Sequence, residues 1–93
     1  MSDEGFASVW DAIEDTPAAA ANLKIRSALM ITLEAQIERR GWSQAEAARR
    51  FGVTQPRVSD LMRGKIDRFG LDTLVNMAVA AGLHVEIRIA AAA

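Results

Sequence analysis

The sequence predicts an all-α domain of five helices, followed by one β-strand that pairs with its own copy across a homodimer. Alanine, the best helix former, supplies 18 of the 93 residues. Apolar residues recur at helical spacing, and a glycine follows most of these stripes. Only the last element alternates with period two. We divide the chain into an arm at 1–16, a helical domain at 17–82 and a strand with its tail at 83–93.

Composition excludes several classes of protein. The chain has no cysteine, which rules out a disulfide framework and a cysteine zinc site, and which fits a reducing cytoplasm. Its first residues are acidic where a signal peptide is basic, and no apolar run approaches the length of about 18 residues that spans a membrane. His84 is the only histidine, is expected at the surface, and has neither a cysteine nor a second histidine with which to bind a metal. No group of residues forms a catalytic constellation, so we expect no cofactor, no metal and no enzymatic activity.

The first predicted helix lies within the arm. Phe6, Val9, Trp10 and Ile13 follow an i, i+3, i+4, i+7 pattern, with acids on the other side. A helix this short is marginal alone and needs a surface to cover it. The stripe therefore packs on its own domain or belongs to a surface for another protein.

The second predicted helix runs from residue 17 to residue 40. Thr16 is its expected N-cap, Pro17 occupies the first helical position, and Gly41 ends it. The apolar residues that continue at helical spacing inside it are Leu23, Met30, Leu33 and Ile37.

Two short helices follow. Ser43 and Glu46 form a capping box, and this helix ends at Phe51 because Gly52 comes next. Thr54 caps the next helix, which Gly64 stops. Two short helices joined by such a tight corner are typical of a helix-turn-helix.

The fifth helix precedes the strand. Its predicted apolar residues are Leu71, Leu74, Val75, Ala78 and Val79, and the methionines Met30, Met62 and Met77 are expected to fill the core. Beyond Gly82, the apolar residues of the strand are Leu83, Val85, Ile87 and Ile89. A lone strand cannot form a stable sheet, so we expect antiparallel pairing with a second copy. The alternative is an extended tail packed on its own helices.

The net charge of −1 hides two opposed segments. Residues 1–16 carry five acids and no base, whereas residues 39–68 carry eight bases against three acids, a net +5. A basic face over a helix-turn-helix is suited to a polyanion. Arg57 adds to this reasoning, because it lies in the first turn of its helix, where the helix dipole favours an acid. The polar residues of this helix could therefore enter a major groove of DNA.

Several segments together resemble a known family. They read Ser43-Gln44-Ala45-Glu46-Ala47-Ala48, Gly52-Val53-Thr54-Gln55 and Val58-Ser59-Asp60-Leu61-Met62-Arg63-Gly64-Lys65. This series resembles the Cro/C1-type (XRE) helix-turn-helix family, whose fold is like that of the lambda repressor. The residues at 10–13, at 68–74 and at 82–85 are similar to the HigA-type antitoxin branch. The resemblance covers about residues 8–89.

The resemblance implies a transcriptional regulator of a palindromic operator, and an antitoxin that binds a RelE-like toxin, with a stand-alone repressor as the alternative. It implies that Gln44 bonds a phosphate and braces Gln55, which would read an adenine. Arg57 could reach a guanine or a phosphate, and we favour the base. Asp60 is expected to pair with Arg57 or Arg63 rather than to accept from cytosine. The full set of expected DNA contacts is Gln44, Thr54, Gln55, Pro56, Arg57, Ser59, Arg63, Lys65 and Arg68.

Overall fold

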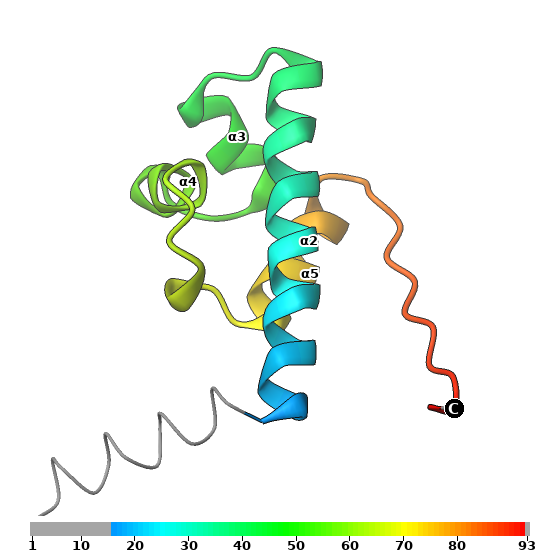
Figure 1. The fold of residues 1–93 in the computed structure, drawn as a ribbon. Helices are drawn as coiled ribbons and strands as arrows, with labels where there is room; N and C mark the ends of the chain where they lie inside the picture. The colour runs from blue at the N-terminus through cyan, green and yellow to red at the C-terminus, as the bar shows by residue number, and fades with distance from the viewer. Residues whose placement is uncertain (1–15, 93) are drawn as a thin grey trace, which may run out of the picture.

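A computed structural model describes residues 16–92 (Figure 1). Over these residues the chain forms four α-helices and one short 3-10 turn. The predicted helix over residues 6–13 and its apolar stripe lie outside the described residues. The described elements are α2 (Pro17–Arg40), α3 (Gln44–Phe51), α4 (Gln55–Met62), η1 (Ile66–Arg68) and α5 (Leu71–Ala80).

The long helix α2 begins and ends where the sequence predicts. The Thr16 hydroxyl accepts a hydrogen bond from the backbone N–H of Ala19 at 3.1 Å, and Pro17 is the first helical residue. Gly41 closes the helix in the left-handed region, at φ 67°. One face of its second half enters the core through Met30, Leu33 and Ile37.

The two short helices are confirmed with their caps. The Ser43 hydroxyl accepts from the Glu46 N–H at 3.1 Å, and the Thr54 hydroxyl accepts from the Arg57 N–H at 3.3 Å. Gly52 stands between the helices at φ 70°, a conformation that costs an L-residue roughly 1–2 kcal/mol. The three residues from Gly52 to Thr54 therefore turn the chain sharply enough for α4 to pack against α3.

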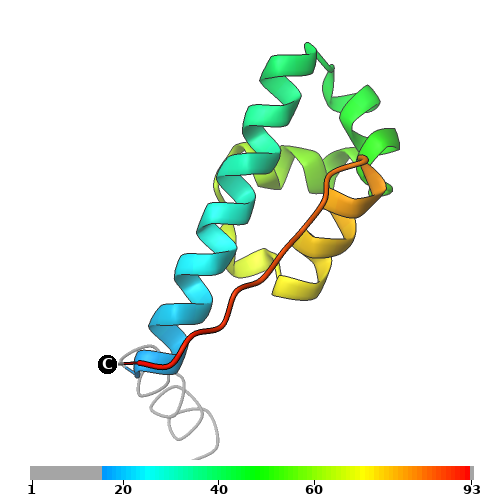
Figure 2. The same ribbon diagram turned by 90° about the vertical axis from the view of Figure 1, so that its right-hand side faces the viewer.

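The core lies where α3 packs on α4 and α5, and where α5 and, to a smaller extent, α4 pack against the side of α2 (Figure 2). Three predicted core residues are wrong: Leu23 is 47% exposed, Met62 is 39% exposed and Val79 is 58% exposed. Met62 lies in the last turn of α4, outside the face on which Val58 and Leu61 are buried. On α5, Met77 is buried in the core and Val79 is not. The buried apolar side chains are Met30, Leu33, Ile37, Ala47, Ala48, Phe51, Val58, Leu61, Phe69, Leu74, Met77 and Ala78.

Residues 63–70 connect α4 to α5, and we call the part from residue 65 onward loop 65–70. The loop contains the 3-10 turn η1, and its Phe69 ring is only 1% exposed. Arg26 of α2 approaches the loop and donates through one nitrogen, Nη1, to the carbonyls of Ile66 at 3.1 Å and Phe69 at 3.3 Å. The loop is thereby attached to the long helix by its main chain.

The C-terminal segment 83–92 is extended and runs along α2 (Figures 1 and 2). It forms no strand in the single described chain, so the predicted β-strand is not confirmed. Leu83 and Val85 pack against the core cluster, whereas Ile87 is 60% exposed and Ile89 is 90% exposed. The first half of the segment thus packs on its own helices, and the second half presents its apolar side chains to solvent.

Candidate nucleic-acid interface

The N-terminal end of α4 is exposed, while the opposite face of the helix is buried. Val58 and Leu61 are fully buried and attach α4 to the core. Thr54, Gln55 and Pro56 are exposed at the beginning of the helix. The first turn of α4 is therefore accessible to a ligand, and the buried face holds the helix in a fixed position.

The two glutamines predicted to act together are both exposed. Gln44 is the first residue of α3, and Gln55 is the first residue of α4. Within the described part of the chain, neither side chain has a hydrogen-bond partner, so the predicted brace between them is not formed. Both amides can therefore donate and accept toward a ligand.

The positive charges around this end of the domain fall into two groups. Arg49 and Arg50 both pair with Glu46, and Arg50 lies over the Trp42 ring at 5.5 Å. Hydrogen bonds from Arg50 and then Arg49 hold the pKa of Glu46 below its usual range. By contrast, Arg63 is exposed and Lys65 is half-buried, and neither forms an ion pair with any described acid.

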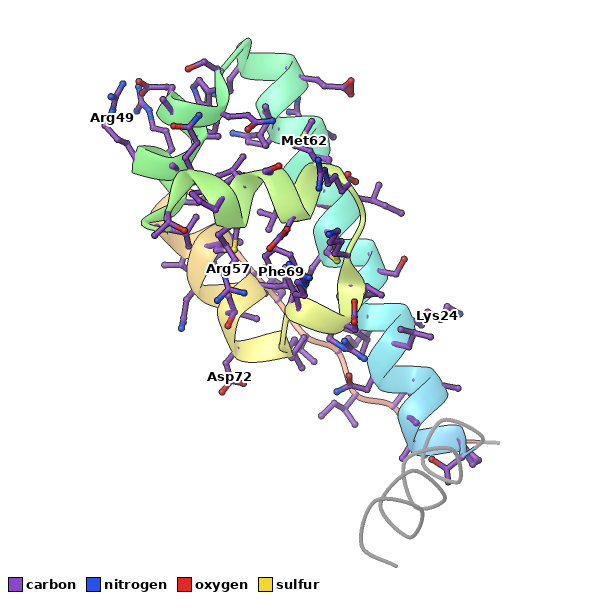
Figure 3. All side chains as sticks on the ribbon, turned by 90° about the vertical axis from the view of Figure 1, so that its left-hand side faces the viewer. Lys24, Arg49, Arg57, Met62, Phe69 and Asp72 are labelled. Atoms are coloured by element: carbon purple, nitrogen blue, oxygen red, sulfur yellow. The ribbon has the colours of Figure 1, made fainter. Side chains whose placement is uncertain are left out.

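Arg57 does not project freely from α4. Its Nη1 donates to the main-chain carbonyl of Arg68 at 2.8 Å, and its guanidinium lies 5.4 Å from the centre of the Phe69 ring. Figure 3 shows Arg57 and Phe69 close together between α4 and α5. A cation in the first turn of a helix costs about 0.3–1 kcal/mol of stability, and these two contacts offset that cost. The position of Arg57 therefore does not require an anionic ligand to explain it.

Asp60 has a different partner from the two that were predicted. Its carboxylate accepts from Arg68 Nη1 at 3.3 and 3.4 Å, not from Arg57 or Arg63. The predicted intrahelical pair is therefore wrong, because Arg57 is held by a carbonyl and Arg68 comes within reach when loop 65–70 folds back on α4. Ser59 is half-buried on the same helix.

The reasoning from sequence missed two residues that shape this region, Arg26 and Phe69. An isolated phenylalanine in a polar loop is a weak signal of burial. Nothing in the spacing of Arg26 indicates that it contacts a segment forty residues away.

The described part of the chain contains neither a metal site nor a membrane-spanning helix. No group of three or more histidine, cysteine or acidic residues in it could hold a metal ion. None of its helices is both long and apolar enough to cross a membrane.

Two capped helices joined by a tight glycine turn, the second with an exposed N-terminal end, define the class of helix-turn-helix proteins. A comparison with protein families agrees with this class: the model of a helix-turn-helix domain matches residues 12–90. The chain therefore belongs to this helix-turn-helix domain family. No match was found among curated proteins.

Proposed function

We propose that this protein is a sequence-specific transcriptional regulator that places α4 in the major groove of DNA. The observation that carries the proposal is the exposed first turn of α4, with the unpartnered amide of Gln55 at its beginning. In helix-turn-helix proteins the N-terminal residues of the second helix contact base edges. The membership of the chain in a helix-turn-helix family supports the same role.

The proposed contacts follow from position and chemistry. Gln55 reads an adenine through its amide, and Pro56 provides an apolar contact with a thymine methyl group. Gln44 bonds a phosphate beside Gln55. Backbone phosphates are contacted by Thr54, Ser59, Arg63, Lys65 and Arg68, which set the register on the duplex.

The test is a gel-shift titration on the DNA upstream of the protein's own reading frame at low salt. We expect binding that weakens steeply as salt rises, because phosphate contacts release counterions. Gln55→Ala should weaken binding and relax the preference at one base pair. Asn76→Ala is the matched control, since it removes an exposed side-chain amide from α5. An absence of binding by the unaltered protein at low salt refutes the proposal.

We also propose a homodimer formed through the C-terminal segment. Among the described residues, the only main-chain hydrogen bond of segment 83–92 joins Leu83 N–H to the Ala78 carbonyl, at 2.9 Å. The extended backbone beyond it is open to strand pairing. A groove of about 230 Å³ beside the segment is lined mainly by apolar side chains, Ile25, Leu29, Val75, Val85 and Ile87 among them. Pairing with a second copy would cover the groove, Ile87 and Ile89.

A two-fold dimer would set two recognition helices about 34 Å apart and so require a palindromic operator. Sedimentation equilibrium tests it: Ile87→Lys with Ile89→Lys should give a monomer, whereas Arg88→Gln between them should leave the dimer intact. A monomeric unaltered protein at micromolar concentration contradicts the homodimer.

Finally, we propose that the regulator is the antitoxin of a toxin–antitoxin pair and represses its own operon. The support is the likeness to HigA-type antitoxins and the five acids of residues 1–16, which suit a basic, RelE-like ribonuclease. Phe6, Val9, Trp10 and Ile13 would supply the apolar contacts. A small basic protein from the adjacent reading frame should co-purify with the full chain and not with a chain lacking residues 1–16. Failure of the full chain to retain it favours a stand-alone repressor.

A further inference from the structure

Loop 65–70 is held from two sides by arginines that bind its main chain. Arg26 of α2 binds the carbonyls of Ile66 and Phe69, and Arg57 of α4 binds the carbonyl of Arg68. Three carbonyls of a six-residue loop are thus bound by side chains from two different helices. The loop is therefore fixed relative to α4, the helix that we place in the major groove.

Arg57 is poorly placed to read a base. It is half-buried, one of its terminal nitrogens is 2.8 Å from the Arg68 carbonyl, and its guanidinium lies over the buried Phe69 ring. A bidentate contact with guanine uses two guanidinium nitrogens, so it would draw the side chain away from both partners. The carbonyl would then lose its charged donor, and the ring would lose its cation.

Arg68, unlike Arg57, is exposed enough to contact DNA. Its side chain is 55% exposed, and its guanidinium is held at the edge of α4 by Asp60, whose own side chain is 21% exposed. The contact distances of 3.3 and 3.4 Å are long for a charge-assisted hydrogen bond. A phosphate oxygen could therefore replace the carboxylate as the partner of Arg68.

We infer that Arg57 is a positioning residue, which fixes loop 65–70 so that Arg68 contacts the DNA backbone beside the recognition helix. The inference deepens the proposed function and rests on it. The residues at the exposed beginning of α4 then read the DNA sequence. Arg57 raises the affinity for DNA by the same factor whatever the sequence of the duplex.

The experiment uses the full chain and a duplex selected by it from a random pool, with a scrambled duplex and a set of single base-pair variants. The variants of the protein are Arg57→Met, Arg68→Gln and the double variant. Lys24→Gln is the control, because it also removes one exposed positive charge but lies on α2 away from α4 (Figure 3). Circular dichroism at the assay temperature shows that each variant is folded.

We expect Arg57→Met to weaken binding to all duplexes by the same factor. It should also lower the slope of log affinity against log salt by about 0.9 for each phosphate that the variant no longer binds. Arg68→Gln should do the same. The double variant should be no weaker than Arg68→Gln alone, because both changes remove the same interaction with DNA. Lys24→Gln should leave the slope nearly unchanged.

A base-reading Arg57 gives a different pattern. Affinity would fall roughly 5- to 150-fold on the selected duplex and hardly at all on the duplex altered at one base pair. That pattern, or additive effects in the double variant, overturns the inference and leaves the proposed function intact. If the unaltered protein binds no duplex at low salt, both are overturned.

Amide hydrogen exchange of the free protein provides a measurement without DNA. Arg57→Met should accelerate exchange at Arg68 and Phe69, whose amides bond the carbonyls of Lys65 and Ile66 within the loop. The amides of α2 should keep their protection. Unchanged exchange at both loop amides would show that Arg57 does not hold the loop, and would overturn the inference.

Discussion

Replacing Arg26 by methionine should test how strongly loop 65–70 is attached to α2. Methionine keeps most of the apolar stem of the arginine and removes the guanidinium. The change therefore deletes the bonds to the carbonyls of Ile66 and Phe69, together with a bond to the Asn22 side chain at 2.6 Å.

The magnitude follows from the geometry. The bonds to both carbonyls come from the same nitrogen and are partly buried, so we count them as one charged hydrogen bond, which contributes about 1.5–3 kcal/mol. The bond to Asn22 is exposed and adds little. For a domain of this size, 1 kcal/mol lowers Tm by about 4–8 °C. We therefore expect Arg26→Met to lower Tm by roughly 6–24 °C.

Thermal unfolding followed by circular dichroism measures this change. All samples need the same chain concentration, because dimer formation would raise the apparent Tm. Lys24→Met is the matched control, because Lys24 is an exposed cation on the same helix. Lys24 forms no ion pair with a described acid. If Arg26→Met and this control unfold at the same Tm, then the bonds from Arg26 do not stabilise the loop.

Three further predictions concern the core, the interface and pH. Phe51→Ala should destabilise the domain by about 3–5 kcal/mol in a urea titration, because the ring is 2% exposed; a loss below 1 kcal/mol contradicts this. Asp60→Asn should raise affinity for scrambled DNA up to about fivefold by releasing Arg68; weaker binding contradicts it. The pKa of Glu46 is lowered, chiefly by Arg50, so its stabilising effect is present at neutral pH and is lost as pH falls through that pKa. The difference in Tm between the wild-type protein and Glu46→Gln should shrink toward acid pH; a constant difference contradicts this.

Local signals in the sequence predicted the helices and their ends. Thr16, Ser43 and Thr54 cap the helices that they precede, since a cap depends only on residues two or three positions away. Gly41 and Gly52 adopt the left-handed conformation expected of helix-ending glycines. Each of these features can be predicted because its cause lies within a few residues.

Contacts between distant segments were not predictable in the same way. Arg57 and Asp60 were expected to act within α4 or on DNA, yet both bind Arg68, which lies in a loop whose path the sequence does not indicate. The alternation at 83–89 correctly indicated extended backbone. A period of two, however, does not specify which edge an extended segment pairs with, so its partner remains a proposal.

The short connection between α3 and α4 also bears on how the domain folds. These helices pack on each other across only three residues, so their contacts can form with little loss of loop entropy. The pairing of α5 with α2 closes a much longer stretch of chain and brings Leu74 and Met77 onto the core. Helical domains dominated by local contacts fold in about microseconds to milliseconds. The helix-turn-helix is thus the part of the domain that can form first, and the arrival of α5 is the step that completes its core.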